Sequence, residues 1–470
     1  MSEIALQAGL IDRAMRRVAT LWRDLSGNGG RVTAPEQDFT AQFRDCLLAR
    51  GGEVSARNRA AALAQEYRGL DAEGRLAFLK ALAAFDSDAQ AVTAAIEALT
   101  AAPNAALRAI ALAKLRRALE PPRLRLLTAF AAIPDGVKFL VAMRAELLAV
   151  MNADPLLQAL ETDLKGLLAS WFDVGFLELR AIDWKSPAAL LEKLVQYEAV
   201  HRIRTWRDLR NRLDSDRRCY AFFHPRMPDE PLIFVEVALE RGMAESVQKI
   251  LDEKAPLQDA SLADTAVFYS INNCQRGLDG ISFGNFLIKR VVELLAAEFP
   301  RLKTFCTLSP MPGFRAWLEK SIATGTALLT PEEGAAFQAD GPGAAGEAPD
   351  PGAKLLGRIL AERGLWQDEA QAKLARAVFS RWAARYLLNE TAPNRPGRAL
   401  DPVAHFHLSN GARVERVNWR ADVSENGFRQ SLGLMVNYLY DPASIEHNHE
   451  AYVGEGLRAA APALKRLIRH

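Results

Sequence analysis

The sequence has little net charge and no long apolar run. Its 59 lysines and arginines nearly balance 57 aspartates and glutamates, which leaves a formal charge of +2. A charge this small gives no long-range field to hold a nucleic acid or an anionic membrane, so any anion site must be local. No run of about 18 apolar residues occurs, and the N-terminal segment is charged throughout and includes acids. We therefore expect a cytoplasmic protein without a membrane span, a secretory signal or a transit peptide.

Cysteine is rare, and its four copies lie far apart with no CxxC pair. This spacing argues against a zinc ribbon, a redox pair and a secreted disulfide framework. Two histidine pairs, His405 with His407 and His447 with His449, are each two residues apart and could share one face of an extended segment, as metal ligands do. No third and fourth ligand follows at a recognisable spacing, so we predict no metal site.

The remaining composition is typical of a globular protein. Hydrophobic residues make up 49% and charged residues 25% of the 470 positions, a length that allows two or three domains. Up to about residue 190, apolar side chains recur at helical spacing, as at Phe78, Leu82 and Phe85, and Gly or Pro interrupts the pattern. We therefore predict an all-helical domain over residues 1–190.

After residue 215 the pattern changes to short runs that are rich in β-branched and aromatic residues. Four such runs, at 219–225, 231–239, 265–272 and 303–310, indicate strands. Between the third and the fourth, residues 283–299 keep helical spacing, so strand, helix and strand follow one another as in an α/β unit. We therefore predict a mixed α/β domain over residues 191–470.

Two segments of this second domain carry further local signals. Residues 404–408 and 412–419 flank Asn410 and Gly411, and Asn-Gly between two alternating runs predicts a β-hairpin. Residues 334–353 are rich in Gly, Ala and Pro and contain one large apolar side chain, which predicts a mobile insert. We assign this insert no role in the chemistry.

Two other segments could bind an anion. Seven arginines against three aspartates between Arg202 and Arg218 indicate either a local positive patch or a solvated helix face. The glycine-rich stretch 275–285 joins a predicted strand to a predicted helix, where free N–H groups can face a phosphate. It fits neither GxGxxG nor GxxxxGK[ST], so a diphosphate cradle and a tight turn without a ligand both stay open. The residues of the candidate cradle are Asp279, Gly280, Ile281, Ser282, Phe283, Gly284 and Asn285.

Ser309 and His407 are candidates for acid–base chemistry. Ser309 follows a predicted strand, and open α/β sheets place their sites at the carboxyl ends of strands. It lacks the flanking glycines of GxSxG, which disfavours an acyl-enzyme, and a serine that only makes a turn before Pro310 is the alternative. His407 stands just before Asn410, on an element able to aim its ring, although a hydrogen-bonded structural histidine is the commoner case.

The second half of the chain resembles the malonyl-CoA decarboxylase family. The resemblance covers roughly residues 195 to 455, and the N-terminal half is similar only in composition, length and placement. The matching blocks are YEAVH at 197–201, RRCYAFFHP at 217–225, EPLIFVEVAL at 230–239, FYSINNCQRGLDGISFGNFLIKRVV at 268–292, LSPMPGF at 308–314, FHLSNGARVERVNWRADVS at 406–424 and GLMVNYLY at 433–440.

The resemblance implies an all-helical N-terminal domain used in homo-oligomer assembly, as a dimer or tetramer, and a GNAT-like (acetyltransferase-type) mixed α/β catalytic domain. The family's serine and histidine fall on Ser309 and His407, and its CoA diphosphate cradle falls on residues 279–285. Some members carry glutamate at the position of Ser282, so no acid role is carried over to that residue. The implied reaction is decarboxylation of malonyl-CoA to acetyl-CoA and CO₂ through a thioester enolate, without a metal or an organic cofactor.

The candidate residues suit this reaction. The site must hold the carboxylate out of the thioester plane, donate to the enolate oxygen and protonate the carbon after CO₂ leaves. We expect Ser309 to engage the carboxylate or relay the proton, and His407, titrating near neutrality, to donate it, although these two roles could be exchanged. A CoA-dependent acyltransferase, a non-catalytic acyl-CoA-binding scaffold and a thioesterase are the alternatives.

Overall fold

The computed structural model describes residues 38–48, 52–281, 286–324, 329–330, 332–333 and 369–468. The insert predicted at 334–353 lies outside these residues. By its internal contacts the chain divides into two compact units, Met1–Leu126 and Leu127–His470.

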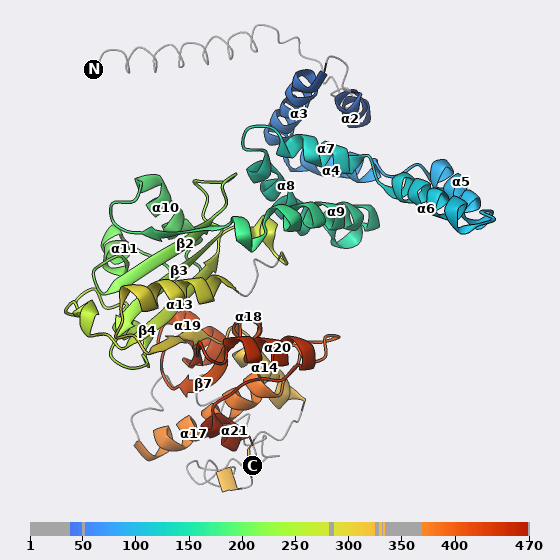
Figure 1. Ribbon diagram of the computed structural model, residues 1–470. Helices are drawn as coiled ribbons and strands as arrows, with labels where there is room; N and C mark the ends of the chain where they lie inside the picture. The colour runs from blue at the N-terminus through green and yellow to red at the C-terminus, as the bar shows by residue number, and fades with distance from the viewer. Residues whose placement is uncertain are drawn as a thin grey trace, which may run out of the picture. The chain divides into compact units, whose positions relative to one another are not determined.

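The described part of the first unit consists of helices (Figure 1). Aromatic rings form the centre of its core, where Phe78 meets Phe39 and Phe43 edge to face at centroid distances of 5.1 Å each. The helices α5 and α6 lie side by side as a hairpin. The described helical pattern confirms the periodicity prediction for this part of the chain. The helices are α2 (Phe39–Leu47), α3 (Gly52–Gly69), α4 (Ala72–Ala84), α5 (Ala89–Thr100), α6 (Ala105–Leu119) and the start of α7 (Arg123–Ala131).

The second unit is built around an eight-stranded mixed sheet with the order β1-β2-β3-β4-β5-β8-β6, in which β7 pairs with β8. Neighbours from β1 to β4 are antiparallel, whereas β4 and β5 are parallel. The parallel pair needs a crossover, which α13 (Phe286–Glu298) supplies. The strands are β1 (Glu178–Ile182), β2 (Arg217–Phe223), β3 (Ile233–Glu240), β4 (Thr265–Asn273), β5 (Thr304–Thr307), β6 (Ser309–Pro310), β7 (Arg413–Asn418) and β8 (Met435–Leu439).

Helices cover both faces of this sheet. Side chains alternate along a strand, so Cys219, Ala221 and Phe223 of β2 pack on α10 and α11, while Tyr220 points to Glu298 of α13 on the other face. A helical N-terminal region followed by a mixed α/β domain confirms the predicted fold class. The other helices are α8 (Gly136–Val150), α9 (Pro155–Trp171), α10 (Ala188–Tyr197), α11 (Trp206–Arg212), α12 (Val247–Ile250), α14 (Phe314–Ala323), α17 (Glu369–Leu388), α18 (Pro402–Ser409), α19 (Glu425–Ser431), α20 (Ile445–Glu455) and α21 (Pro462–Leu467).

The hairpin predicted around Asn410 and Gly411 is wrong. Residues 404–408 belong to α18, and β7 pairs with β8 instead of with a preceding strand. Asp401 caps α18 and Pro402 occupies its first turn, which are helix-start signals, and Gly411 has a φ of +80° just after the helix ends. A short apolar run cannot distinguish a strand from a helix by periodicity, and here the caps decide.

None of the helices within the described ranges is long and apolar enough to cross a membrane.

Candidate active site

Ser309 and His407, 98 residues apart in the sequence, lie within hydrogen-bonding distance of each other. Ser309 Oγ is 3.0 Å from His407 Nε2, and it lies 2.9 Å from Thr307 Oγ1. The other ring nitrogen of His407, Nδ1, is 2.7 Å from the hydroxyl of Tyr440. Thr307, Ser309, His407 and Tyr440 therefore form a continuous chain of hydrogen bonds, and all four side chains are buried.

Adjacent strands set the position of Ser309. Thr307 ends β5 and Ser309 begins β6, so the two side chains are two residues apart and point to the same side. Strand β8 fixes both, because Asn437 donates from Nδ2 to the carbonyl of Thr307 at 2.7 Å and Ser309 pairs with Val436. The strand predicted over 303–310 is thus divided in two: Ser309 lies two residues beyond the carboxyl end of β5 and is the first residue of β6.

His407 is carried by α18 and held by aromatic neighbours. Its ring stacks on Tyr438 with a centroid distance of 4.4 Å and an interplanar angle of 26°. Only 2% of the residue is exposed, and this burial lowers the pKa of His407 to about 3. The imidazole is therefore neutral at pH 7 in the free protein, so the expectation that it titrates near neutrality is wrong.

The pair opens onto a cavity of about 220 Å³. Its wall is mostly apolar, and no lysine or arginine is among the described residues that line it. A carboxylate in this cavity would be held by hydroxyl and imidazole groups instead of by a cation. The lining residues are Val200, Phe268, Tyr269, Ser270, Ile271, Asn273, Ser309, Pro310, Pro402, Val403, Phe406 and His407.

The structure describes only the start of the predicted diphosphate cradle. Asp279, Gly280 and Ile281 follow a short 3-10 turn, whereas Ser282, Phe283, Gly284 and Asn285 lie outside the described residues. The buried Arg144 of α8 donates to the carbonyls of Gly277, at 2.6 Å, and Asp279, at 2.9 Å.

Helix α9 also approaches this loop. Gly280 has a φ of +73°, and an added Cβ there would lie 3.4 Å from Nζ of Lys165. Neither Arg144 nor Lys165 was found by sequence reasoning, because both lie more than 100 residues before the loop, in a region that the periodicity assigned only to helix formation.

The remaining sequence candidates do not form a site. His405 and His407 are two residues apart on a helix and so point in different directions, with His405 Nδ1 2.9 Å from the hydroxyl of Tyr452. His449 Nδ1 lies 2.7 Å from the carbonyl of Ser409. Among the residues that the structure describes, no group of three or more His, Cys, Asp or Glu side chains is placed to hold a metal.

The arginine-rich stretch is partly neutralised within the fold. Arg212, only 2% exposed, pairs with Asp208 and Glu236, and the buried Arg217 pairs with Asp216. These two arginines contribute neither to a surface patch nor to a solvated helix face.

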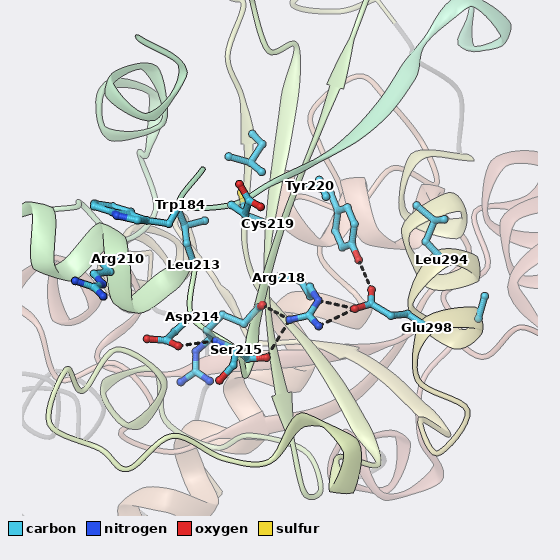
Figure 2. A pocket seen from close by; sticks show the side chains of 15 residues that line it. Trp184, Arg210, Leu213, Asp214, Ser215, Arg218, Cys219, Tyr220, Leu294 and Glu298 are labelled. Carbon is cyan, nitrogen blue, oxygen red and sulfur yellow. Dashed lines mark hydrogen bonds and ion pairs between the residues drawn. The ribbon is translucent and has the colours of Figure 1, made fainter. Parts of the chain in front are cut away.

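A second, larger cavity of about 890 Å³ lies where β1 ends beside β2, between α11 and α13 (Figure 2). Its lining shares no residue with the cavity at Ser309 and His407. Arg218 and Tyr220 of β2 both reach Glu298 of α13 across it, the first as an ion pair at 2.6 Å. The exposed Trp184 and Arg210 lie on its opposite side, with the guanidinium 5.9 Å from the ring centroid.

Comparison with known proteins identifies the family. A family model described as the malonyl-CoA decarboxylase C-terminal domain matches residues 175–470, and one described as the malonyl-CoA decarboxylase N-terminal domain matches residues 85–172. The chain is 38% identical over 328 residues to the mitochondrial malonyl-CoA decarboxylase of Anser anser anser, a match that covers 68% of this chain and 64% of that protein. The match thus spans less than two thirds of that relative's length.

Two crystal structures are similar over most of the chain. Malonyl-CoA decarboxylase from Rhodopseudomonas palustris is 44% identical with a TM-score of 0.79, and the match covers 91% of this chain and 98% of that one. The enzyme of the same name from Agrobacterium vitis is 42% identical with a TM-score of 0.81, covering 92% and 99%. With both family models and both structures in agreement, this chain belongs to the malonyl-CoA decarboxylase family.

Proposed function

We propose that this protein converts malonyl-CoA to acetyl-CoA and CO₂, with Ser309 and His407 as its catalytic residues and no metal or organic cofactor. The observation that carries the proposal is the 3.0 Å contact between Ser309 Oγ and His407 Nε2 on the wall of a small, mostly apolar cavity. We infer the reaction from the family to which the chain belongs, and the contact brings together two groups that are able to perform it.

The reaction needs an electron sink, which the substrate itself carries. When the bond between the terminal carboxylate and C2 breaks, its electron pair moves into the thioester carbonyl as an enolate, and CO₂ leaves. An apolar cavity favours this step because the charge of the compact carboxylate becomes spread over the enolate. In this scheme Ser309 forms a hydrogen bond with the carboxylate. His407 lies near the carbonyl oxygen and C2 and donates a hydrogen bond there.

The protonation of C2 follows from the state of His407. The free imidazole is neutral and acts as a hydrogen-bond donor. The negative charge of a bound carboxylate raises the pKa of an adjacent histidine, so His407 takes up a proton from water when the substrate binds. The resulting imidazolium gives this proton to C2 after CO₂ leaves, directly or through Ser309, and returns to the neutral form.

The CoA portion is assigned to the loop that begins at Asp279. Its exposed Gly280 has the positive φ that lets backbone approach a ligand, and Lys165 of α9 adds a positive charge beside it. Residues 282–285 complete the loop in the proposal on the family resemblance alone.

The proposal extends to a homo-oligomer, a dimer or tetramer, assembled through the helical N-terminal part of the chain. Within the predicted helical domain over residues 1–190, Glu178–Ile182 form β1 of the sheet and so belong with the catalytic domain predicted over residues 191–470. The apolar side chains exposed along α5 and α6 support the homo-oligomer, since five of them lie on this one hairpin. They are Ile96, Leu107, Ile110, Leu112 and Leu119. A cytoplasmic location stays a prediction, checked by fractionating cells that express the full chain.

Product analysis with malonyl-CoA as the single substrate tests the reaction. Equimolar CO₂ and acetyl-CoA are expected, unchanged by a chelator, and in D₂O the acetyl group should gain one deuterium. Release of free CoA and malonate would identify a thioesterase, inertness until an amine is added an acyltransferase, and binding without turnover a scaffold.

Substitutions at the pair test the residues. Ser309→Ala and His407→Asn are each expected to lower kcat by about 10² to 10⁴, the usual cost of an oriented acid–base group. His405→Asn is the matched control, because His405 lies on the same helix, binds Tyr452 and does not line the cavity. Turnover in either Ser309→Ala or His407→Asn close to that of the control would remove that residue from the mechanism.

A further inference from the structure

Asp401 is a fully buried carboxylate at the start of the helix that carries His407. Its Oδ1 accepts hydrogen bonds from the backbone N–H groups of Val403 and Ala404, both at 2.9 Å, and so caps α18. Its Oδ2 accepts the hydroxyl of Tyr386, on α17, at 3.1 Å. The carboxylate thereby links α18 to α17, the helix that precedes it in the chain.

The segment that follows Ser309 packs on the same tyrosine. The ring centroid of Phe314, five residues after Ser309, lies 5.7 Å from that of Tyr386. A Cβ at Gly313 would lie 2.4 Å from the hydroxyl of Tyr386, so only glycine allows this approach. Asp401, Tyr386 and Gly313 therefore form a buried junction between the Ser309 segment and the His407 helix.

Capping alone does not explain this burial. Asp154, which also precedes a proline, caps α9 in the same way, by accepting from the backbone N–H groups two and three residues further on, and it remains partly exposed. A buried carboxylate loses its hydration and must be compensated by donors, so burying Asp401 costs stability that a surface cap avoids. Burial raises the pKa of Asp401 to about 6, which reflects that cost.

We propose that Asp401 is a positioning residue for the reaction: by joining α18 to Tyr386, against which the Ser309 segment packs at Gly313, it holds His407 Nε2 within hydrogen-bonding distance of Ser309 Oγ. The expected effect of Asp401 on kcat rests on the proposed function, whereas its expected effect on the distance between Ser309 and His407 does not. A displacement of about 1 Å between reacting groups can lower a rate about 10²-fold, so a loosened junction reduces kcat while leaving the CoA loop unchanged.

Asp401→Asn separates the cap from the junction. The asparagine oxygen can still accept from Val403 and Ala404. Its NH₂ group, in place of Oδ2, can no longer accept from Tyr386 and bonds to that hydroxyl only if the hydroxyl reverses from donor to acceptor. Tyr386→Phe removes the other side of the same link. Asp154→Asn is the matched control, since it makes the same change at a cap that contacts neither Ser309 nor His407.

We expect kcat for malonyl-CoA to fall about 10-fold in Asp401→Asn and in Tyr386→Phe, with KM within about twofold of wild type. The double variant should lose little more than either single one, because both break one link. Asp154→Asn should keep wild-type kcat. Circular dichroism and thermal unfolding provide the folded fraction by which each kcat is corrected. A corrected kcat of Asp401→Asn equal to that of Asp154→Asn, or a change confined to KM, overturns the proposal.

A crystal structure of Asp401→Asn provides a readout that is independent of activity. The distance between Ser309 Oγ and His407 Nε2 should lengthen beyond 3.5 Å, the limit of a hydrogen bond. An unchanged distance overturns the positioning role even if turnover falls. If wild-type protein releases no CO₂ from malonyl-CoA, the proposed function fails, and this distance still decides the role of Asp401.

Discussion

The neutral imidazole of His407 can place its one proton on either ring nitrogen, and its neighbours permit both choices. With the proton on Nε2, His407 donates to Ser309, and Tyr440 donates to Nδ1. With the proton on Nδ1, His407 donates a hydrogen bond to the hydroxyl oxygen of Tyr440, and Ser309 donates one to Nε2. Because Tyr440 is buried and its pKa is raised well above the ordinary value, its hydroxyl keeps its proton at neutral pH. The chain of hydrogen bonds can therefore switch direction when substrate charge arrives.

The burial of His407 also predicts a pH dependence of stability. Its pKa falls from 6.5 in the unfolded chain to about 3 in the folded protein, so between these values only the unfolded chain binds the proton. The contribution of His407 to stability is therefore full above pH 6.5 and is lost as pH falls toward 3, at about 1.4 kcal/mol per pH unit. Urea unfolding of wild type and His407→Asn at pH 7, 6 and 5 measures it.

The quantity to compare is the difference between the two proteins. Other buried groups, such as Asp401 and Glu236, titrate in both, so their effects cancel. Wild type should lose about 1.4 kcal/mol relative to His407→Asn for each pH unit below about 6. Parallel pH curves would show that His407 is not a neutral buried group.

Sequence reasoning found some members of this hydrogen-bonded chain and missed others. Ser309 and His407 were candidates because the blocks around them match a family and because Ser309 follows a predicted strand. Thr307 and Tyr440 carry no spacing signal, since they meet the pair only through the pairing of β5, β6 and β8. The low pKa of His407 was also beyond reach, because it depends on Tyr438 and other groups that close over the ring.

At the scale of elements, the helix α18 shows that a local cap decides where apolar periodicity does not. The run 404–408 suits a strand as well as a helix, and the alternation of its two histidines favoured the strand. Asp401 decides in favour of the helix, because its carboxylate satisfies two backbone N–H groups at the helix start. The same misassignment placed His405 beside His407, whereas the helix directs one to Tyr452 and the other to Ser309.

The contact between α8 and the turn before the CoA loop predicts an effect of a single methyl group. A Cβ at Gly277 would lie 1.8 Å from the carbonyl oxygen of Val141, so Gly277→Ala must separate the turn from the helix. We expect a loss of about 2 to 3 kcal/mol in stability and a higher KM for malonyl-CoA, because Arg144 loses its two carbonyl acceptors.

Gly166→Ala on α9 is the matched control, since nothing lies within 4 Å of its added Cβ. Alanine there should stabilise the helix by about 0.5 to 1 kcal/mol. Thermal unfolding and KM measurements on both variants check the prediction. Equal stability of the two variants would contradict a direct contact between α8 and the turn.

At the scale of the whole molecule, periodicity sufficed for the order of helical region and mixed sheet. Helical spacing before residue 190 and short β-rich runs after 215 each reflect burial on one face of an element, which is local information. The parallel pairing of β4 with β5 and the path of β7 onto β8 depend on which distant strands meet. The positions of Arg144 and Lys165 also depend on which distant segments meet, because each residue lies on a helix that contacts the CoA loop.

The α5–α6 hairpin provides a test of the proposed oligomer. Its only buried side chains are Ala95 and Ala111, while Leu107 and Ile110 are 47% and 55% exposed and lie one turn apart on α6. Leu107→Glu combined with Ile110→Glu should reduce the assembled mass measured by light scattering to that of a smaller species, because charges would face an apolar partner surface. Leu457→Glu, at a site 56% exposed and outside the hairpin, is the matched control and should leave the mass unchanged. The circular dichroism spectra of both variants should match that of wild type, since none of these side chains belongs to the core. An unchanged mass in the double variant would show that any assembly uses a surface other than this hairpin.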